Sequence, residues 1–108
     1  MKIKLSPVRL DEQLTASVSG DIIILNGEAL DFSPLEDGES LPAAAISHRW
    51  IGGEVSRIDG EISITLVLPH GANAPNETRY PAAFHLPMTV TDGDVPLPPY
   101  DALQEMPA

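Results

Sequence analysis

The sequence predicts a small all-β domain built from antiparallel hairpins. Apolar and polar residues alternate from Ile62 to Leu68, with Val67 as the exception, which is typical of a strand with one buried face. Two-residue turn signals separate such segments, because Asn-Gly and Asp-Gly readily adopt the positive φ angles of tight hairpin turns. The 11 prolines and 8 glycines favour many short strands over long helices. The turn signals are Asn26-Gly27, Asp59-Gly60, Asp92-Gly93 and the weaker Ser19-Gly20.

The length of the chain sets the domain organisation. A chain of 108 residues is long enough for one modest core but not for two. We therefore expect a single β domain over residues 1–101 and a flexible C-terminal tail over residues 102–108. The hairpins and meander are expected to form a small sandwich or a partly open barrel with at most one short helix, and the pattern leaves both architectures open.

Two neighbouring turns predict a three-stranded meander in the first third of the chain. The Ser-Gly turn, taken as a two-residue loop, pairs Ala16 with Ile23. The Asn-Gly turn pairs Ile23 with Leu30. Both registers place the same apolar residues on one face, as a sheet with a buried side requires. That face carries Leu14, Ala16, Val18, Ile23, Leu25, Leu30 and Phe32. Ile22 and Ile24 fall on the opposite face, where they are either covered or form a contact surface.

The Asp-Gly turn at residues 59–60 predicts a second hairpin that supplies much of the core. Its register pairs Arg57 with Ile62, Val55 with Ile64, Gly53 with Leu66 and Ile51 with Leu68. One face then consists of Ile51, Val55, Ile62, Ile64, Leu66 and Leu68. Only Arg57 interrupts this face, and we expect its long stem to carry the guanidinium to water at the turn end.

The remaining elements are predicted from shorter patterns. Alternation in Lys2–Leu5 indicates a first strand. Alternation in Phe84–Thr91 indicates a last strand, which Pro87 restricts to a sheet edge because proline lacks an N–H. The Asp-Gly turn at residues 92–93 would then begin a final hairpin. Residues 41–48 could form one or two helical turns near Pro42, and the proline-rich segment 96–100 is expected to be extended.

Charge and composition argue against several classes of function. The 6 basic and 16 acidic residues give a formal charge of −10, and the basic residues are scattered. Binding to nucleic acid or to an anionic membrane is therefore not expected, because both require a basic surface. The longest apolar run, Ile22–Leu25, is too short to cross a bilayer. The N-terminus lacks the apolar run of a signal peptide, so we expect a soluble protein of the cytoplasm.

No reactive constellation is evident in the sequence, so we expect a protein that is not an enzyme. There is no cysteine, and the spacing of His48, His70 and His85 matches no compact metal-ligand motif. No serine lies in a nucleophile-elbow motif. We therefore expect no cofactor and no metal site.

The connection Pro69–Pro81 is the main candidate for a contact with another protein. It is long for a loop in a small β domain, and such loops are often functional. The competing interpretation is a plain crossover made rigid by its prolines. Trp50 would lie close to this loop, at the open end of the hairpin, and tryptophan is enriched at interfaces. The candidate partner-binding residues are Trp50, His70, Asn73, Asn76, Arg79 and Tyr80.

Three segments carry a resemblance to a known group of proteins. They are RIDGEISITLVLPHGANAPNETRYP, NGEALDFSPLEDGESLP and PLPPYD. They resemble small uncharacterised proteins encoded in tail gene clusters of tailed phages and of prophages in Gram-negative bacteria. The resemblance covers residues 1 to about 101, and no motif in it has a chemical role that could be transferred.

Two hypotheses about function follow. The resemblance implies a phage or prophage structural or accessory protein, associated with the tail, whose partner is another phage structural protein. It would act in the host cytoplasm or on the virion, through a sheet edge or the Pro69–Pro81 loop. The alternative is a small ligand-binding or enzymatic β-barrel. A barrel should contain a cavity lined by some of His48, His70, His85, Arg57 and Asp59, whereas an interaction module should expose an apolar strip near Ile22, Ile24 or Trp50.

Overall fold

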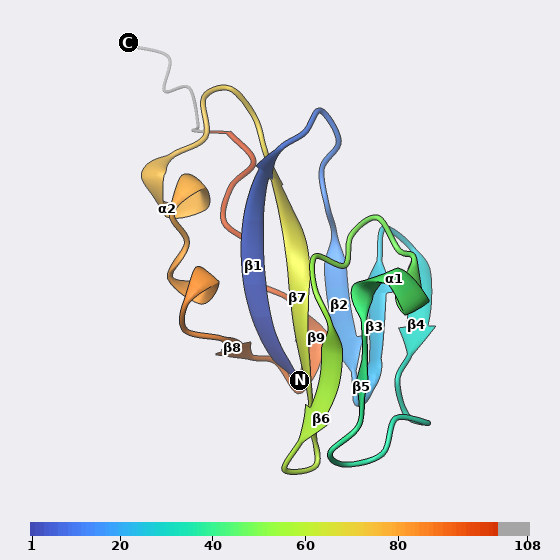
Figure 1. Cartoon of the computed structure of the whole chain (residues 1–108). Coiled ribbons are helices and arrows are strands. Elements are labelled where there is room, and N and C mark those ends of the chain that lie inside the picture. Colours follow the sequence, from blue (N-terminus) through green and yellow to red (C-terminus); the bar gives the residue numbers. More distant parts are fainter. Residues whose placement is uncertain (102–108) are drawn as a thin grey trace, which may run out of the picture.

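The chain forms two β-sheets that pack face to face as a sandwich (Figure 1). The structure, a computed structural model, describes residues 1–101, so the predicted tail lies outside the described residues. The larger sheet has the strand order β5-β6-β7-β1-β8 and the smaller sheet has the order β4-β3-β2-β9. The strands are β1 Lys2–Arg9, β2 Ala16–Ser19, β3 Ile22–Leu25, β4 Glu28–Asp31, β5 Ser40–Leu41, β6 Val55–Ile58, β7 Glu61–His70, β8 Met88–Thr89 and β9 Asp92–Asp94. The predicted all-β class is confirmed, and of the two predicted architectures the structure has the sandwich.

The smaller sheet contains the predicted meander with one corrected register. Strands β3 and β4 pair as predicted, with Ile23 opposite Leu30. Strands β2 and β3 instead pair Val18 with Ile23, so the turn consists of Gly20 and Asp21. Gly20 has a φ of 61°, which suits the hairpin turn that requires glycine first. The shift of two residues keeps every side chain on its predicted face, because side chains alternate with a period of two.

The hairpin of β6 and β7 follows its prediction near the turn and departs from it farther away. Arg57 lies opposite Ile62 as predicted. Beyond Val55 the predicted pairs of Gly53 with Leu66 and Ile51 with Leu68 are wrong, because Ile51 pairs with Leu66. The two glycines at positions 52 and 53 lie in this slipped segment and lack the side chains that would hold a strand in register. Ile51 still faces the core, because the slip is again two residues.

A parallel pair lies at the centre of the larger sheet, where the sequence predicted only antiparallel hairpins. Strand β1 runs parallel to β7 and places Ile3 opposite Ile64 and Leu5 opposite Leu66. Figure 1 shows the two strands side by side. The chain forms most of the smaller sheet before it returns to this pairing. The predicted strand at the N-terminus is therefore confirmed, and the pairing adds its apolar side chains to the interior.

One apolar core joins the two sheets. It contains the predicted inner faces of both hairpins, and Ile62, Ile64, Leu66 and Leu68 are all buried. Trp50 closes one end of it and is 3% exposed. The segment Ile62 to Leu68 is thus part of the scaffold.

The last two strands belong to different sheets, so the predicted hairpin at residues 92–93 is wrong. Strand β8 pairs with β1 in the larger sheet, whereas β9 pairs with β2 in the smaller one. The predicted strand Phe84–Thr91 is reduced to Met88–Thr89, which does lie at a sheet edge as Pro87 required. The chain crosses between the layers where a hairpin was expected.

Three short helical segments complete the described chain. The predicted helix is present as α1, Ala43–Ile46, and begins directly after Pro42. Two further helical segments, α2 (Asn76–Arg79) and the 3-10 turn η1 (Ala82–Phe84), lie where the sequence predicted loop and strand. Within residues 1–101, no helix is long and apolar enough to span a membrane.

Candidate protein-interaction site

The connection between β7 and β8 forms an ordered ridge beside the edge of the larger sheet. Pro75 precedes α2 and Pro81 precedes η1, both with extended backbone angles. Proline at such positions favours the start of a helical turn because its φ is fixed. Figure 1 shows α2 and the following turn standing next to β1. The prolines therefore convert a long loop into two short helical turns.

Buried polar contacts fix this ridge to the rest of the protein. The Thr78 side chain is fully buried, and its hydroxyl donates a hydrogen bond to the carbonyl of Pro99 over 2.6 Å. The Arg79 guanidinium donates from Nε to the Ala74 carbonyl (2.9 Å) and from Nη2 to the Ala72 carbonyl (2.7 Å). These bonds satisfy carbonyls of the preceding loop and hold the ridge in one conformation.

The ridge presents large apolar side chains to solvent. Tyr80 is 80% exposed, Phe84 is 49% exposed and Leu86 is 73% exposed. The Phe84 and His85 rings meet edge to face, with centroids 4.8 Å apart. We call Tyr80, Phe84, His85 and Leu86 the aromatic patch; the first three line one hollow, and Leu86 lines a second one that shares Pro81 with it. Exposed apolar side chains that gather on one element mark contact sites more often than scattered ones do.

A shallow hollow of about 270 Å³ lies within this surface. Its lining consists of Pro7, Arg79, Tyr80, Pro81, Phe84 and His85. Arg79 is the one fully charged residue in this lining, and its position is fixed by the carbonyls described above. The hollow can therefore receive an apolar side chain and place a fixed cation beside it.

The structure separates the six predicted contact residues. Arg79 and Tyr80 line the hollow. His70, Asn73 and Asn76 lie elsewhere on the connection and do not line it. Asn73 contributes its backbone N–H, which binds the Asp101 carboxylate at 3.1 Å.

Trp50 offers no surface to a partner, so its inclusion among the contact residues was wrong. Its ring is buried in the core, and the Arg49 guanidinium lies 4.7 Å from the ring centroid. Arg49 in turn forms a bidentate ion pair with Glu12, at 2.7 and 3.0 Å. Trp50 therefore covers one end of the core, which is its commoner role.

Sequence reasoning missed Phe84, His85 and Leu86. Their alternation resembled a strand, whereas the structure places Phe84 in η1 and leaves all three side chains exposed. The signal that could have identified them is the pair of prolines at positions 81 and 87. Prolines so close together leave too little room for a paired strand between them.

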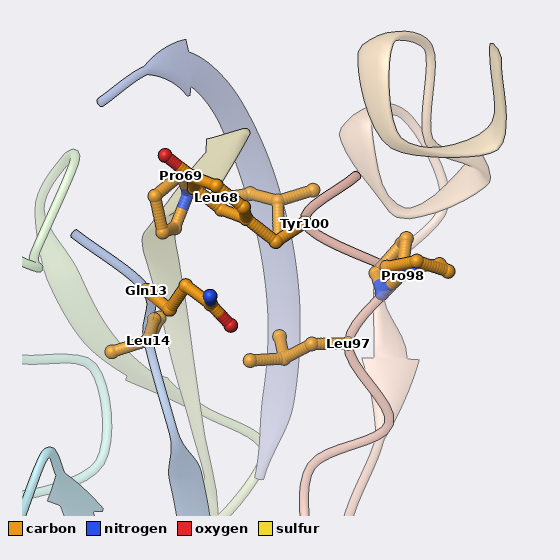
Figure 2. A pocket seen from close by; sticks show the side chains of 8 residues that line it. Gln13, Leu14, Leu68, Pro69, Leu97, Pro98 and Tyr100 are labelled. Carbon is orange, nitrogen blue, oxygen red and sulfur yellow. The ribbon is translucent and has the colours of Figure 1, made fainter. Parts of the chain in front are cut away.

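The C-terminal strap, residues Val95–Asp101, forms a second hollow against the sandwich, with a volume of about 230 Å³. Figure 2 shows Leu97, Pro98 and Tyr100 of the strap across from Gln13 and Leu14. The Tyr100 hydroxyl donates to the Leu10 carbonyl, and the Gly71 N–H donates to the Tyr100 carbonyl at 2.9 Å. Among the described residues, no Asp, Glu, Lys, Arg or His lines this hollow. The polar groups beside the hollow hold the strap against the sandwich. The hollow is therefore a boundary between two segments of the chain, and its described lining has no group suited to acid–base chemistry.

The histidines are dispersed over the molecule. His48 Nε2 lies 2.5 Å from Glu28 Oε2, His70 Nδ1 lies 3.1 Å from the Gly71 carbonyl, and His85 contacts Phe84. Within residues 1–101, no group of three His, Cys, Asp or Glu side chains is arranged to hold a metal ion. The cavity expected for a ligand barrel would have required several of these histidines to converge.

Arg57 does not reach water as predicted but joins the two sheets. Its guanidinium binds Asp21 Oδ2 at 2.9 Å and the carbonyl of Phe32 at 3.2 Å, and it also donates to the carbonyls of Leu35 and Gly60. Only 12% of the side chain is exposed. The planar, multiply donating guanidinium suits this role, so Arg57 has a structural function.

Strand addition is disfavoured at two of the four sheet edges, the one formed by β1 and β8 and the one formed by β9. Strand β8 covers only Lys2 and Ile3 of β1, but η1 packs against β1 beyond β8. Pro7 in β1 has no backbone N–H, so it interrupts the row of hydrogen-bond donors along β1. Strand β9 carries Asp92 and Asp94, and charged or proline-containing edges are typical devices against strand addition. Of the two predicted contact modes, the geometry favours the connection.

The ridge therefore carries the candidate site, and its chemistry is that of a binding surface. No protein-family model matches the chain, and no curated protein or solved structure was found to match it.

Proposed function

We propose that this protein is a non-enzymatic interaction module that binds another protein through the aromatic patch. The observation that carries the proposal is the exposure of Tyr80, Phe84 and Leu86 on one ordered ridge. Each exposed large apolar side chain is costly in water, and aromatic anchors supply much of the energy at protein interfaces.

The rigidity of the ridge supports the same proposal. A surface that is already held in one conformation loses little conformational entropy on binding. The Thr78 and Arg79 hydrogen bonds and the prolines before α2 and η1 provide this preorganisation. An apolar side chain of the partner would enter the hollow, and a carboxylate beside it would reach Arg79.

We propose a phage structural protein, associated with the tail, as the partner. The support for this identity is the resemblance of the chain to small proteins of phage tail gene clusters. The acidic net charge of −10 is in keeping with a protein that binds neither nucleic acid nor an anionic membrane. The complex would form in the host cytoplasm, and the protein would then either leave the assembly or stay with the virion.

Site-specific photo-crosslinking tests this proposal. Tyr80 is replaced by p-benzoylphenylalanine in an induced lysogen that encodes the chain, and cross-linked products are identified by mass spectrometry. We expect one dominant product containing a phage structural protein. The matched control carries the same photoreactive residue at Ile58, which lies on β6 and is 58% exposed. This control should give no such product.

A second change guards against chance cross-links. Leu86→Ser in the Tyr80 photoreactive background should reduce the product at least tenfold, because it removes an apolar contact without touching the reactive position. Equal products from positions 80 and 58, or an unchanged product with Leu86→Ser, would contradict the proposal.

A further inference from the structure

The outer face of the smaller sheet has a pattern that the aromatic patch does not explain. The strand registers place side chains in two rows that cross all four strands. The first row is Ala29, Ile24, Ser17 and Asp94, and the second row is Asp31, Ile22, Ser19 and Asp92. Each row therefore has an isoleucine near its middle and an aspartate on β9. We call these eight residues the isoleucine face.

The two isoleucines of this face point away from the core. Ile23, between them in sequence, is fully buried, whereas Ile22 and Ile24 are half-buried. Among residues 1–101, the partly buried apolar side chains that pack against the core do not include Ile22 or Ile24. Ile22 and Ile24 are partly exposed and lie outside the core cluster, so part of their aliphatic surface is available to a partner.

The charges around the isoleucines have one sign. Asp31 lies on one edge strand and Asp92 and Asp94 lie on the other. Within the described part of the chain, none of these three carboxylates pairs with a cation. The sequence has no lysine or arginine between Arg9 and Arg49, a stretch that includes β2, β3 and β4. The isoleucine face is thus aliphatic at its centre and anionic at both edges.

We propose that the isoleucine face binds a cationic protein segment that crosses the strands. Its apolar side chains would cover Ile22 and Ile24, and lysine or arginine at each end would pair with the aspartates. Asp31 and Asp92 are three strand spacings apart, about 14 Å at 4.7–4.9 Å per spacing. About ten helical residues span this distance, so an amphipathic helix with basic ends fits the face. A second copy of this chain does not fit, because its own face carries the same negative charges.

The isoleucine face is distinct from the aromatic patch, so the test of this proposal does not depend on the proposed function. The experiment uses the full-length, 15N-labelled protein and the peptide acetyl-KKALAALLAALKK-amide, in which leucines form one helical face between two lysine pairs. We expect amide shifts centred on Ser17, Ile22 and Ile24 and small shifts at Tyr80 and Phe84. Two control peptides replace either all lysines by glutamate or all leucines by glutamine.

Protein variants separate apolar from charged contributions. Ile22→Thr with Ile24→Thr keeps β-branched residues in the strand, and Asp92→Asn with Asp94→Asn keeps the shape of the rim. Each double variant should weaken peptide binding at least fivefold, whereas Ile58→Thr on the other sheet should leave it unchanged. The amide spectrum of each variant reports whether it is folded.

Three results would overturn the proposal. If the glutamate peptide binds as tightly as the lysine peptide, positive charge on the partner does not contribute to recognition. If the glutamine peptide binds as tightly as the lysine peptide, apolar contacts with Ile22 and Ile24 do not contribute to recognition. Shifts centred on Glu36–Glu39 or on the aromatic patch, or dimerisation through the isoleucine face in sedimentation experiments, would assign the surface to a different contact.

Discussion

The two sheets of this protein are built in different ways. The smaller sheet joins β2, β3 and β4 by two-residue turns, so these three strands are neighbours both in space and in sequence, and only β9 comes from a distant part of the chain. The larger sheet depends on the parallel pairing of β1 with β7, which brings Ile3 beside Ile64. A tight turn specifies its own pairing, but a parallel pair is specified only by the core that it helps to bury. Local turn signals therefore explain the meander of β2, β3 and β4 and the hairpin of β6 and β7.

The outer faces of the two sheets differ as well. One row across the larger sheet consists of Ser40, Ser56, Ser63, Lys2 and Thr89. Those residues are polar, as expected for a face in contact with water. The corresponding rows of the smaller sheet keep Ile22 and Ile24 at their centre. The exposed isoleucine of the larger sheet, Ile58, lies at the turn end of β6 and not at the centre of its sheet. The central position of Ile22 and Ile24 is therefore the contrast on which the proposed contact surface rests.

The largest expected effect comes from the three consecutive isoleucines of β3. Ile23→Ala should lower the free energy of unfolding by about 3 kcal/mol, because it leaves a cavity in the shared core. Ile22→Ala and Ile24→Ala should each cost less than about 1 kcal/mol. Urea denaturation of the three variants measures the difference. Similar losses at all three positions would show that the outer face is packed, contrary to the comparison of the sheets.

Removal of the arginine that joins the sheets should have the next largest effect. Arg57→Met should lower the free energy of unfolding by about 2–3 kcal/mol, because it leaves Asp21 and three carbonyls without their donor. Arg57→Lys should recover only part of this loss, since an ammonium cannot reach all of these acceptors at once. Exposed Arg9, changed to Met, is the control and should remain within about 0.5 kcal/mol of the wild type. A tolerated Arg57→Met would show that the two sheets hold together by their apolar core alone.

A smaller effect is expected where the ridge meets the strap. Thr78→Val should cost about 1 kcal/mol, because it removes the hydrogen bond from the buried Thr78 hydroxyl to the Pro99 carbonyl. Amide hydrogen exchange should become faster at Gly71, whose N–H binds the Tyr100 carbonyl of the strap. Thr89→Val, at an exposed position of β8, should leave that exchange unchanged. Unaltered protection at Gly71 in Thr78→Val would mean that the strap is held by its other contacts.

The smallest effect concerns one carboxylate of the isoleucine face. The hydrogen bond from the Ser33 backbone N–H lowers the pKa of Asp31 below its ordinary value of 3.8. Because the folded-state pKa is depressed, the bond stabilises the protein above the unfolded-state pKa. That contribution is lost as the pH falls through the folded-state pKa. NMR titration of the carboxyl carbon should therefore show Asp31 titrating below the ordinary value of 3.8, and a midpoint at or above that value would contradict the assigned hydrogen bond.

The candidate site was only partly predictable from the sequence. Arg79 and Tyr80 were identified because they lie in a long connection, and such connections often carry contacts. Phe84 and Leu86 were not, since their alternation resembles that of a strand and only the helical turn after Pro81 turns them toward solvent. Trp50 was misplaced for the opposite reason, because a residue type common at interfaces is also common at the end of a core.

By itself, the sequence determined the β class, the apolar face of each hairpin and the position of the tight turns at residues 26–27 and 59–60. These features depend on neighbours a few residues apart, and a register error of two residues leaves a face unchanged. Only the tertiary structure decided that β1 joins β7, that β8 and β9 belong to different sheets and that Arg57 is enclosed between the layers. Such contacts join residues far apart in the chain, and their free energy arises from core packing that no local pattern contains.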